Sequence, residues 1–194
     1  MKTVSVLLLA VLFSCGQATN DLEKLQAELE EKEAKMEMPE VAEGFKEYST
    51  DVFWMNYPED WELEAKEEDG LKFSIFTPLD GETDMFRENM NMTTEALPNS
   101  SITLSYYIES AMEMIEQSIP ELKVLENKTV KGKYGDYQKV VYSGNYGGMN
   151  LHWKQFVQIK GSTAYVTSFT ALSETFDKFD AISEKTMSSF IVKE

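Results

Sequence analysis

The sequence predicts an α+β fold in which an antiparallel sheet lies between helices. Short runs rich in β-branched and aromatic residues are separated by glycine-containing turns in the C-terminal half of the chain. Two other segments repeat apolar residues every three or four positions, which is typical of amphipathic helices. Strands come first, then a helix, then a group of strands and a final helix. This order predicts helices packed on an antiparallel sheet.

Three strands are expected before the first helix. They are Val52–Tyr57, Leu71–Thr77 and Asn89–Glu95. Because side chains alternate between the two faces of a strand, Met90 and Met92 should lie on the same face of the third one.

The first amphipathic helix precedes Pro120, which ends it. Its apolar stripe steps by three or four positions and consists of Leu104, Ile108, Ala111, Ile115 and Ile119. Glutamates occupy positions off this stripe, so one face of the helix should pack and the other should meet solvent.

Strands return after Pro120, and a second helix closes the chain. The expected strands are Val124–Val130, Tyr137–Ser143, Met149–Ile159 and Thr163–Ala171. The loops Gly144–Gly148 and Lys160–Ser162 are short enough to join the last three strands as antiparallel hairpins. The closing helix carries an apolar stripe from Phe176 to Phe190, with Ser173 or Thr175 as its N-cap.

Residues 1–14 have the features of a cleaved export signal. The apolar run Val4–Phe13 would span about 15 Å as a helix, roughly half the hydrocarbon core of a membrane. The stretch Leu12-Phe13-Ser14-Cys15-Gly16 resembles the lipobox of bacterial lipoproteins, although Phe13 departs from the usual small or aliphatic residue. The resemblance implies cleavage before Cys15 and lipidation of that residue. Because Gly16 rather than an aspartate follows, attachment to the outer membrane, facing the periplasm, is expected.

Residues 15–43 form an acidic segment that is expected to be a helical tether. Leu22, Leu25, Leu29 and Met36 lie near a heptad spacing, and Pro39 ends the pattern. A stalk that dimerises and a solvated spacer helix both fit, and so short a pattern favours the spacer. Residues 44–194 are expected to form one domain, which is long enough to bury a core without metals or disulfides.

The composition excludes several classes of protein. The 194 residues carry a formal net charge of −16 and contain one Cys and one His. A single Cys rules out an internal disulfide and an all-thiolate zinc site. The acidic balance argues against binding to nucleic acid, which needs clustered Lys and Arg. We therefore expect no metal and no cofactor.

The candidate catalytic and metal-binding residues all have simpler interpretations. His152 lies within an expected strand, without a nucleophile motif, and should be a strand-face residue on the side opposite Leu151 and Trp153. Asp80, Glu82 and Asp84 have the spacing that begins a calcium loop, but Met85 stands where that loop needs Gly. Solvated loops are expected there and at the charged hairpin tip 67–70.

Methionines and aromatic residues are numerous and are expected to fill the core. The chain has 11 Met residues, which would suit Cu(I), but core filling explains the number better. Six aromatic side chains could instead line a ligand pocket: Trp54, Tyr57, Trp61, Trp153, Tyr165 and Phe169. Sheet core is the commoner explanation for such a set.

Several stretches together resemble the PsbP-like superfamily, which includes bacterial lipoproteins of DcrB or LpqN type. They are Val52 to Trp61, Phe86 to Met92, Gln155 to Ala171 and Ser188-Ser189-Phe190, in the order found in that family. The resemblance implies an α/β/α sandwich that acts mostly as an interaction or accessory module. It supplies no catalytic signature to assign to this chain.

The sequence therefore predicts a lipid-anchored accessory or scaffold protein that binds a protein partner at the envelope and is not an enzyme. The alternative is a lipoprotein that binds a small molecule or an ion in a pocket between sheet and helices. Apart from Cys15, no site residue is assigned by the sequence.

Overall fold

A small sheet is formed by the first strands of the domain and the end of the chain. The computed structural model describes residues 39–82 and 84–193, and one compact unit spans Val41–Glu194. The small sheet is antiparallel and contains β1 (Phe45–Ser49), β2 (Phe53–Pro58) and β10 (Ile191–Val192), with β2 in the middle. Every residue of β2 is buried.

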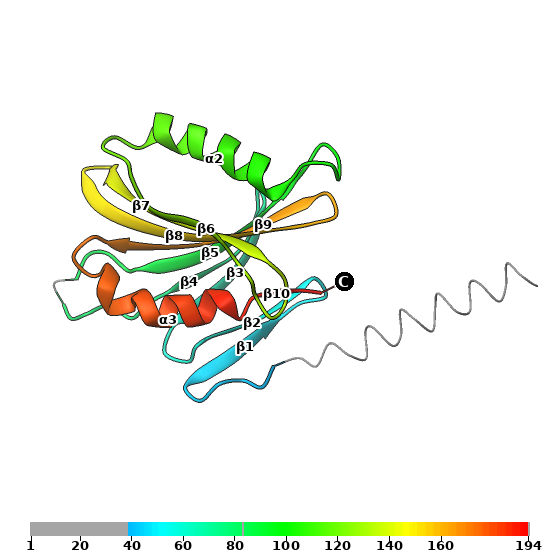
Figure 1. Cartoon of the computed structure of the whole chain (residues 1–194). Helices are drawn as coiled ribbons and strands as arrows, with labels where there is room; N and C mark the ends of the chain where they lie inside the picture. The colour runs from blue at the N-terminus through cyan, green and yellow to red at the C-terminus, as the bar shows by residue number, and fades with distance from the viewer. Residues whose placement is uncertain (1–38, 83, 194) are drawn as a thin grey trace, which may run out of the picture. The chain divides into compact units, whose positions relative to one another are not determined.

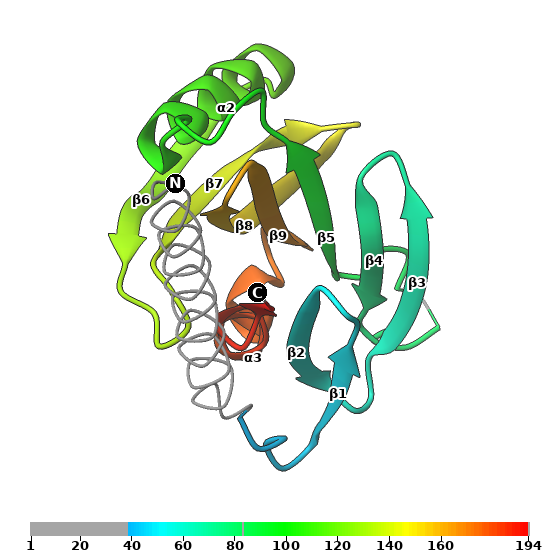
Figure 2. The same ribbon diagram turned by 90° about the vertical axis from the view of Figure 1, so that its right-hand side faces the viewer.

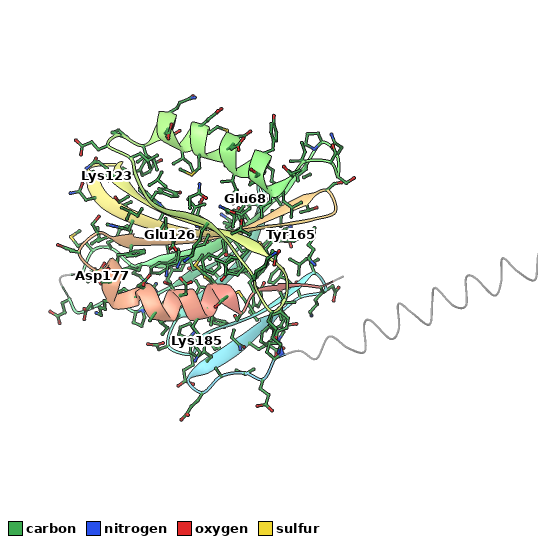
Figure 3. All side chains as sticks on the ribbon, in the orientation of Figure 1. Glu68, Lys123, Glu126, Tyr165, Asp177 and Lys185 are labelled. Atoms are coloured by element: carbon green, nitrogen blue, oxygen red, sulfur yellow. The ribbon has the colours of Figure 1, made fainter. Side chains whose placement is uncertain are left out.

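A seven-stranded antiparallel sheet forms the centre of the domain. Its order is β3, β4, β5, β9, β8, β7, β6. The bounds in that order are Glu62–Glu68, Leu71–Phe76, Asn89–Ala96, Thr163–Leu172, Met149–Lys160, Tyr137–Tyr146 and Lys123–Val130. The outer strands β3 and β6 carry charged side chains such as Glu68, Lys123 and Glu126, which discourage edge-to-edge pairing (Figure 3).

The two helices cover opposite faces of the large sheet. Helix α2 (Leu104–Ser118) lies on one face, and α3 (Phe176–Ser188) lies on the other face together with the small sheet (Figures 1 and 2). The sheet thus has two apolar layers. Phe73, Met90, Phe156 and Phe169 belong to the core on the α3 side, whereas Val140 and Val157 belong to the smaller cluster on the α2 side.

Tight turns join the strands because glycine adopts positive φ there. Asp69 and Gly70, which form the charged hairpin tip, have φ of 50° and 86°, so they make a two-residue turn between β3 and β4. Gly147 and Gly148 make the same kind of turn between β7 and β8, with φ of 61° and 82°. The strands β7 and β8 therefore extend further than the sequence predicts.

The fold class and the element types predicted from the sequence are confirmed. All seven predicted strands and both helices are present, and Met90 and Met92 share a fully buried face. The strands β1, β3 and β10 were not predicted, because the first two are short or strongly charged and the third has two residues. Residues 1–38, with the predicted signal peptide, Cys15 and most of the tether, lie outside the described residues.

Candidate functional site

Helix α2 is attached to the sheet at both ends. At its start, Thr103 Oγ1 accepts a hydrogen bond from the backbone N–H of Tyr106 (3.2 Å), as an N-cap does. One residue further, the Tyr107 hydroxyl donates to Glu95 on β5 (2.8 Å), and burial raises the Tyr107 pKa above its usual value. This end of α2 is therefore tied to the middle of the sheet.

The other end of α2 rests on a glycine in β7. A Cβ at Gly144 would collide with Ile119 Cγ2 and lie 3.1 Å from the Pro120 carbonyl oxygen, so only glycine permits this approach. The Pro120 carbonyl also accepts a hydrogen bond from Asn145 N–H (3.1 Å). A glycine within a strand is the sequence signal for such a close approach, although the sequence analysis placed Gly144 in a turn.

Between its two attachments, α2 stands above the sheet over an apolar cavity of about 650 Å³. Close-packed protein interiors leave few voids larger than a water molecule, and pockets for small ligands usually measure about 300–1,000 Å³. From the helix, Ile108, Ala111, Met112 and Ile115 line the cavity. The sheet contributes Val140, Trp153, Val157 and Val166.

A few polar side chains also face the cavity. Asn89, Gln155 and Thr170 come from the three central strands of the sheet. The Gln155 amide donates to Ser168 Oγ (3.3 Å), which orients it. An apolar wall with a few placed polar groups is the usual composition of a small-molecule site.

Exposed apolar side chains surround the opening of the cavity. Met114 on α2 is 63% exposed, and Tyr146 and Met149, which flank the β7–β8 turn, are 58% and 40% exposed. Large apolar groups at the surface of a hollow commonly mark a binding site.

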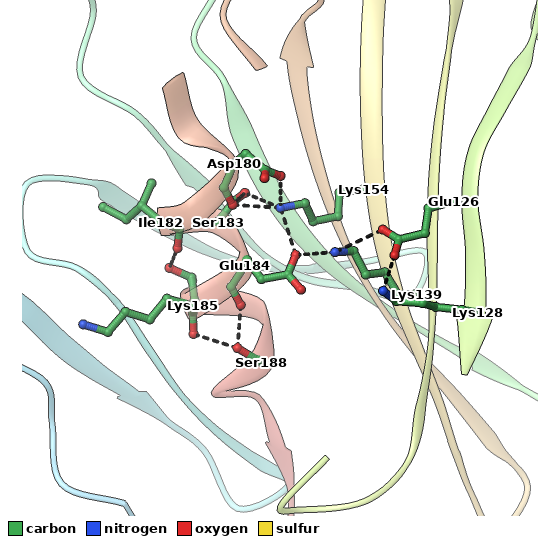
Figure 4. A network of polar contacts seen from close by, with 11 residues as sticks. Glu126, Lys128, Lys139, Lys154, Asp180, Ile182, Ser183, Glu184, Lys185 and Ser188 are labelled. Carbon is green, nitrogen blue, oxygen red and sulfur yellow. Dashed lines mark hydrogen bonds and ion pairs between the residues drawn. The ribbon is translucent and has the colours of Figure 1, made fainter. Parts of the chain in front are cut away.

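The other helix, α3, is held to the sheet by an ionic network (Figure 4). Lys154 on β8 is fully buried, and its Nζ lies 2.6 Å from Asp180 Oδ1 and 3.1 Å from Glu184 Oε2. The same amine donates to the Asp180 carbonyl oxygen (2.8 Å) and to Ser183 Oγ (3.2 Å). All of its contacts stay inside the fold, so the arrangement indicates a structural role.

Lys139 on β7 extends this network to the outer strand. It contacts Glu184 Oε2 at 2.8 Å and Glu126 Oε2 at 3.2 Å. Partial burial acts to lower the Lys139 pKa, but hydrogen bonds to Glu184 and Glu126 outweigh it and raise the pKa. A hydrogen bond from Lys128 lowers the Glu126 pKa.

His152 lies on the strand face that the sequence predicts, opposite Leu151 and Trp153. Its ring stacks on Phe176 at 4.9 Å between centroids, and Nδ1 lies 2.9 Å from Ser173 Oγ. Burial lowers the His152 pKa, although the Asp177 charge acts in the opposite direction. No local pattern in the sequence indicates this Ser–His contact, because it joins positions 21 residues apart in the chain.

The Ser173–His152 pair lies outside the cavity under α2. Neither residue lines that cavity or two smaller hollows, one beside β1 and β2 and one at the start of α3. A general base must reach a bound substrate to act on it. The pair therefore fits a structural contact better than a catalytic one.

The acidic loop after β4 uses its carboxylates to hold its own backbone. Asp84 accepts hydrogen bonds from Asp80 N–H (2.8 Å) and Phe86 N–H (3.0 Å), and these lower the Asp84 pKa. Asp80 pairs with Lys178 on α3, and Glu82 is exposed. Among residues 39–82 and 84–193, no three His, Cys, Asp or Glu side chains are arranged to hold a metal ion.

Most of the aromatic set belongs to the core. Trp54, Tyr57, Trp61 and Phe169 are buried on the α3 side or within the small sheet. Of the six aromatic residues, only Trp153 lines the cavity under α2. The pocket is instead lined mainly by aliphatic residues and methionine from α2 and the sheet.

The sequence also matches a model of a known protein family. The model of the PsbP-like protein family matches residues 4–187. The chain belongs to the PsbP-like protein family. A search of curated protein sequences finds no match.

Solved structures of PsbP-like fold are similar to the chain at low sequence identity. Cyanobacterial PsbP (CyanoP) from Synechocystis has a TM-score of 0.58 and 16% identity, over 78% of this chain and 94% of that one. A protein of unknown function from Pseudomonas aeruginosa has a TM-score of 0.58 and 12% identity, over 77% of this chain and 98% of that one. LpqN from Mycobacterium tuberculosis, described as involved in cell envelope biogenesis, has a TM-score of 0.54 and 11% identity, over 73% of this chain and 83% of that one. These likenesses establish the fold.

The described part of this PsbP-like chain contains no helix with both the length and the apolar character needed to cross a membrane.

Proposed function

We propose that this PsbP-like chain is a lipid-anchored, non-enzymatic protein of the cell envelope whose domain binds an apolar small molecule under α2. The observation that carries the proposal is the cavity of about 650 Å³, lined mainly by apolar side chains. The lipobox-like stretch ending at Cys15 supports the anchoring, and outer-membrane attachment facing the periplasm is part of the proposal. The fold shared with LpqN is consistent with an envelope role.

Filling the cavity tests the proposal. Ala111 lines the cavity from α2, so Ala111→Trp should place an indole inside it. We expect this variant to bind the neutral fluorescent probe N-phenylnaphthylamine about tenfold more weakly or worse, a loss of at least about 1.4 kcal/mol. The measurement is a fluorescence titration of the chain carrying Cys15→Ala, purified without detergent.

The matched control is Ala181→Trp, which adds the same side chain to the exposed face of α3. It should bind the probe as the parent chain does. Equal binding by the Ala111→Trp variant, with an unchanged circular dichroism spectrum, would show that the probe does not enter the cavity and would overturn the proposal.

A second candidate function is the binding of a protein partner, which the sequence favours. The observation behind it is the outer strand β6, where Val124 and Leu125 are 46% and 54% exposed. Exposed apolar side chains on an outer strand can pack against the surface of another protein. One stoichiometric partner cross-linked to the anchored protein, and lost with Leu125→Lys, would favour this function over small-molecule binding.

A further inference from the structure

The cavity under α2 adjoins a second hollow with a different chemical character. This hollow of about 380 Å³ is lined by residues of the β4–β5 connection and of the start of α3. Both segments lie at the left-hand side of the ribbon in Figure 1. Phe86 and Met149 line both hollows, so the two meet at these side chains. One elongated molecule could therefore occupy both.

The second hollow is strongly acidic. Four carboxylates line it (Asp80, Asp84, Glu88 and Glu174), and Lys178 is the one basic side chain among its lining residues. Lys178 is already paired with Asp80. Within the described part of the chain, neither Glu88 nor Glu174 forms an ion pair. The local charge is therefore negative even after the pairing.

Glu88 places one of these carboxylates inside the protein. Its side chain is only 3% exposed, and it accepts hydrogen bonds from Thr175 Oγ1 and from Thr77 Oγ1 (3.4 Å). Lys178 acts on Glu88 through its charge but forms no ion pair with it, so a positively charged ligand group would further stabilise the buried carboxylate. Phe86 and Phe179 also line this hollow, and aromatic rings attract ammonium groups, as the Lys178 amine 5.2 Å from the centre of the Phe179 ring illustrates.

We propose that the two hollows together bind an amphiphile with a single alkyl chain and a cationic head group. This inference rests on the proposed function, because the alkyl chain would occupy the cavity under α2. The ammonium head lies among the carboxylates and phenylalanine rings of the second hollow. An anionic head there would meet like charges at close range, which is strongly unfavourable.

Three probes with chains of ten carbons test this assignment: decyltrimethylammonium, decyl maltoside and decanoate, whose chain includes the carboxylate carbon. Their head groups are cationic, neutral and anionic, respectively. Isothermal titration calorimetry of the detergent-free chain carrying Cys15→Ala, below the micellar concentration of each probe, measures the affinities. We expect decyltrimethylammonium to bind about tenfold more tightly than decanoate, with decyl maltoside between them.

Two charge variants test whether the acidic hollow causes the preference for the cationic probe. Glu174→Gln changes an exposed carboxylate that lines the acidic hollow, and Glu113→Gln changes an exposed carboxylate on α2 that lines neither hollow. Both alter the net charge equally. We expect Glu174→Gln to reduce the preference for the cationic probe several-fold and Glu113→Gln to leave it unchanged. Glu88→Gln, which keeps the size of the buried side chain, should act like Glu174→Gln.

A failure of the head-group assignment can be distinguished from a failure of the proposed function. Equal affinities for the three probes, a preference for decanoate or maltoside, or no difference between Glu174→Gln and Glu113→Gln would overturn the head-group assignment and leave the apolar site standing. If none of the decyl probes binds and N-phenylnaphthylamine does not bind either, the proposed function fails as well.

Discussion

His152 is the only histidine of the chain, so its ring resonances report one environment without overlap from another imidazole. The ring lies between Phe176 and the Ser173 hydroxyl, and burial is the main cause of its lowered pKa. The folded state thus favours the neutral ring.

We predict that the imidazole titrates below 6.5, the ordinary value of a histidine. The unfolded chain then binds more protons than the folded chain between the folded pKa and 6.5. The contribution of His152 to the unfolding free energy is therefore complete above pH 6.5 and is lost as the pH falls through the folded pKa.

An NMR titration of the ring measures the pKa directly, and denaturant unfolding at several pH values measures the stability. The His152→Phe variant keeps a ring against Phe176 and should lack this part of the pH dependence. A midpoint at or above 6.5 would contradict the prediction.

At the scale of the element, the two helices are held to the sheet by different forces. Helix α2 touches the sheet firmly at its ends and leaves a cavity beneath its middle. Helix α3 packs on the main aromatic core and adds the buried ionic network of Lys154. We infer that α2 is the helix with room to adjust to a ligand.

Removing the charge of Lys154 should weaken the attachment of α3. Lys154→Met leaves Asp180 and Glu184 without their common cation, and the loss is moderated because these side chains are 52% and 36% exposed and can bind water. We expect the unfolding free energy to fall by about 1–3 kcal/mol, measured by denaturant unfolding.

Lys128→Met is the matched control for this change. Lys128 pairs with Glu126 in the same network but is 58% exposed, so its loss should cost no more than about 1 kcal/mol. A Lys154→Met variant as stable as the control would show that the buried network contributes nothing net to stability.

At the scale of the whole molecule, the strong negative charge bears on how the protein stays at a membrane. With a net charge of −16, the chain has no electrostatic attraction to anionic lipid head groups. Attachment would therefore depend on the lipid that the lipobox-like stretch implies at Cys15, and several acyl chains suffice for stable anchoring.

We predict that Cys15→Ala moves the protein from the membrane fraction to the soluble fraction. Cell fractionation with immunodetection measures this distribution. Phe13→Ala keeps the cysteine and places a small residue two positions before it, as a lipobox usually has, so this control should remain in the membrane fraction. Recovery of the Cys15→Ala protein in membranes with a normally processed signal would exclude lipid anchoring.

Much of the fold could be predicted from the sequence, because helix and strand periods depend on residues close together in the chain. The stripe from Leu104 to Ile119 indicates α2, and the spacing of glycines from Gly144 to Gly161 indicates consecutive hairpins. Strand β3 escaped prediction because it has no buried face: of its residues only Leu63 is half-buried, so no apolar alternation marks the strand.

The candidate site could be predicted only in part. The sequence indicated a pocket between sheet and helices as an alternative function, but of the six aromatic residues considered for its lining only Trp153 lines the cavity. One signal could have helped: Gly144 inside a strand indicates the close approach of another segment, here the end of α2.

The α+β class, the order of the elements and the lipobox-like stretch at Cys15 follow from the sequence alone, since each depends on residues that are close together in the chain. The position of α2 above the sheet, and the fact that Phe86 and Met149 line both an apolar cavity and an acidic hollow, depend on the tertiary structure. The physical reason is that a cavity is the space left between surfaces. Its size and lining depend on contacts such as that of Ile119 with Gly144, which join residues far apart in the chain and leave no local pattern.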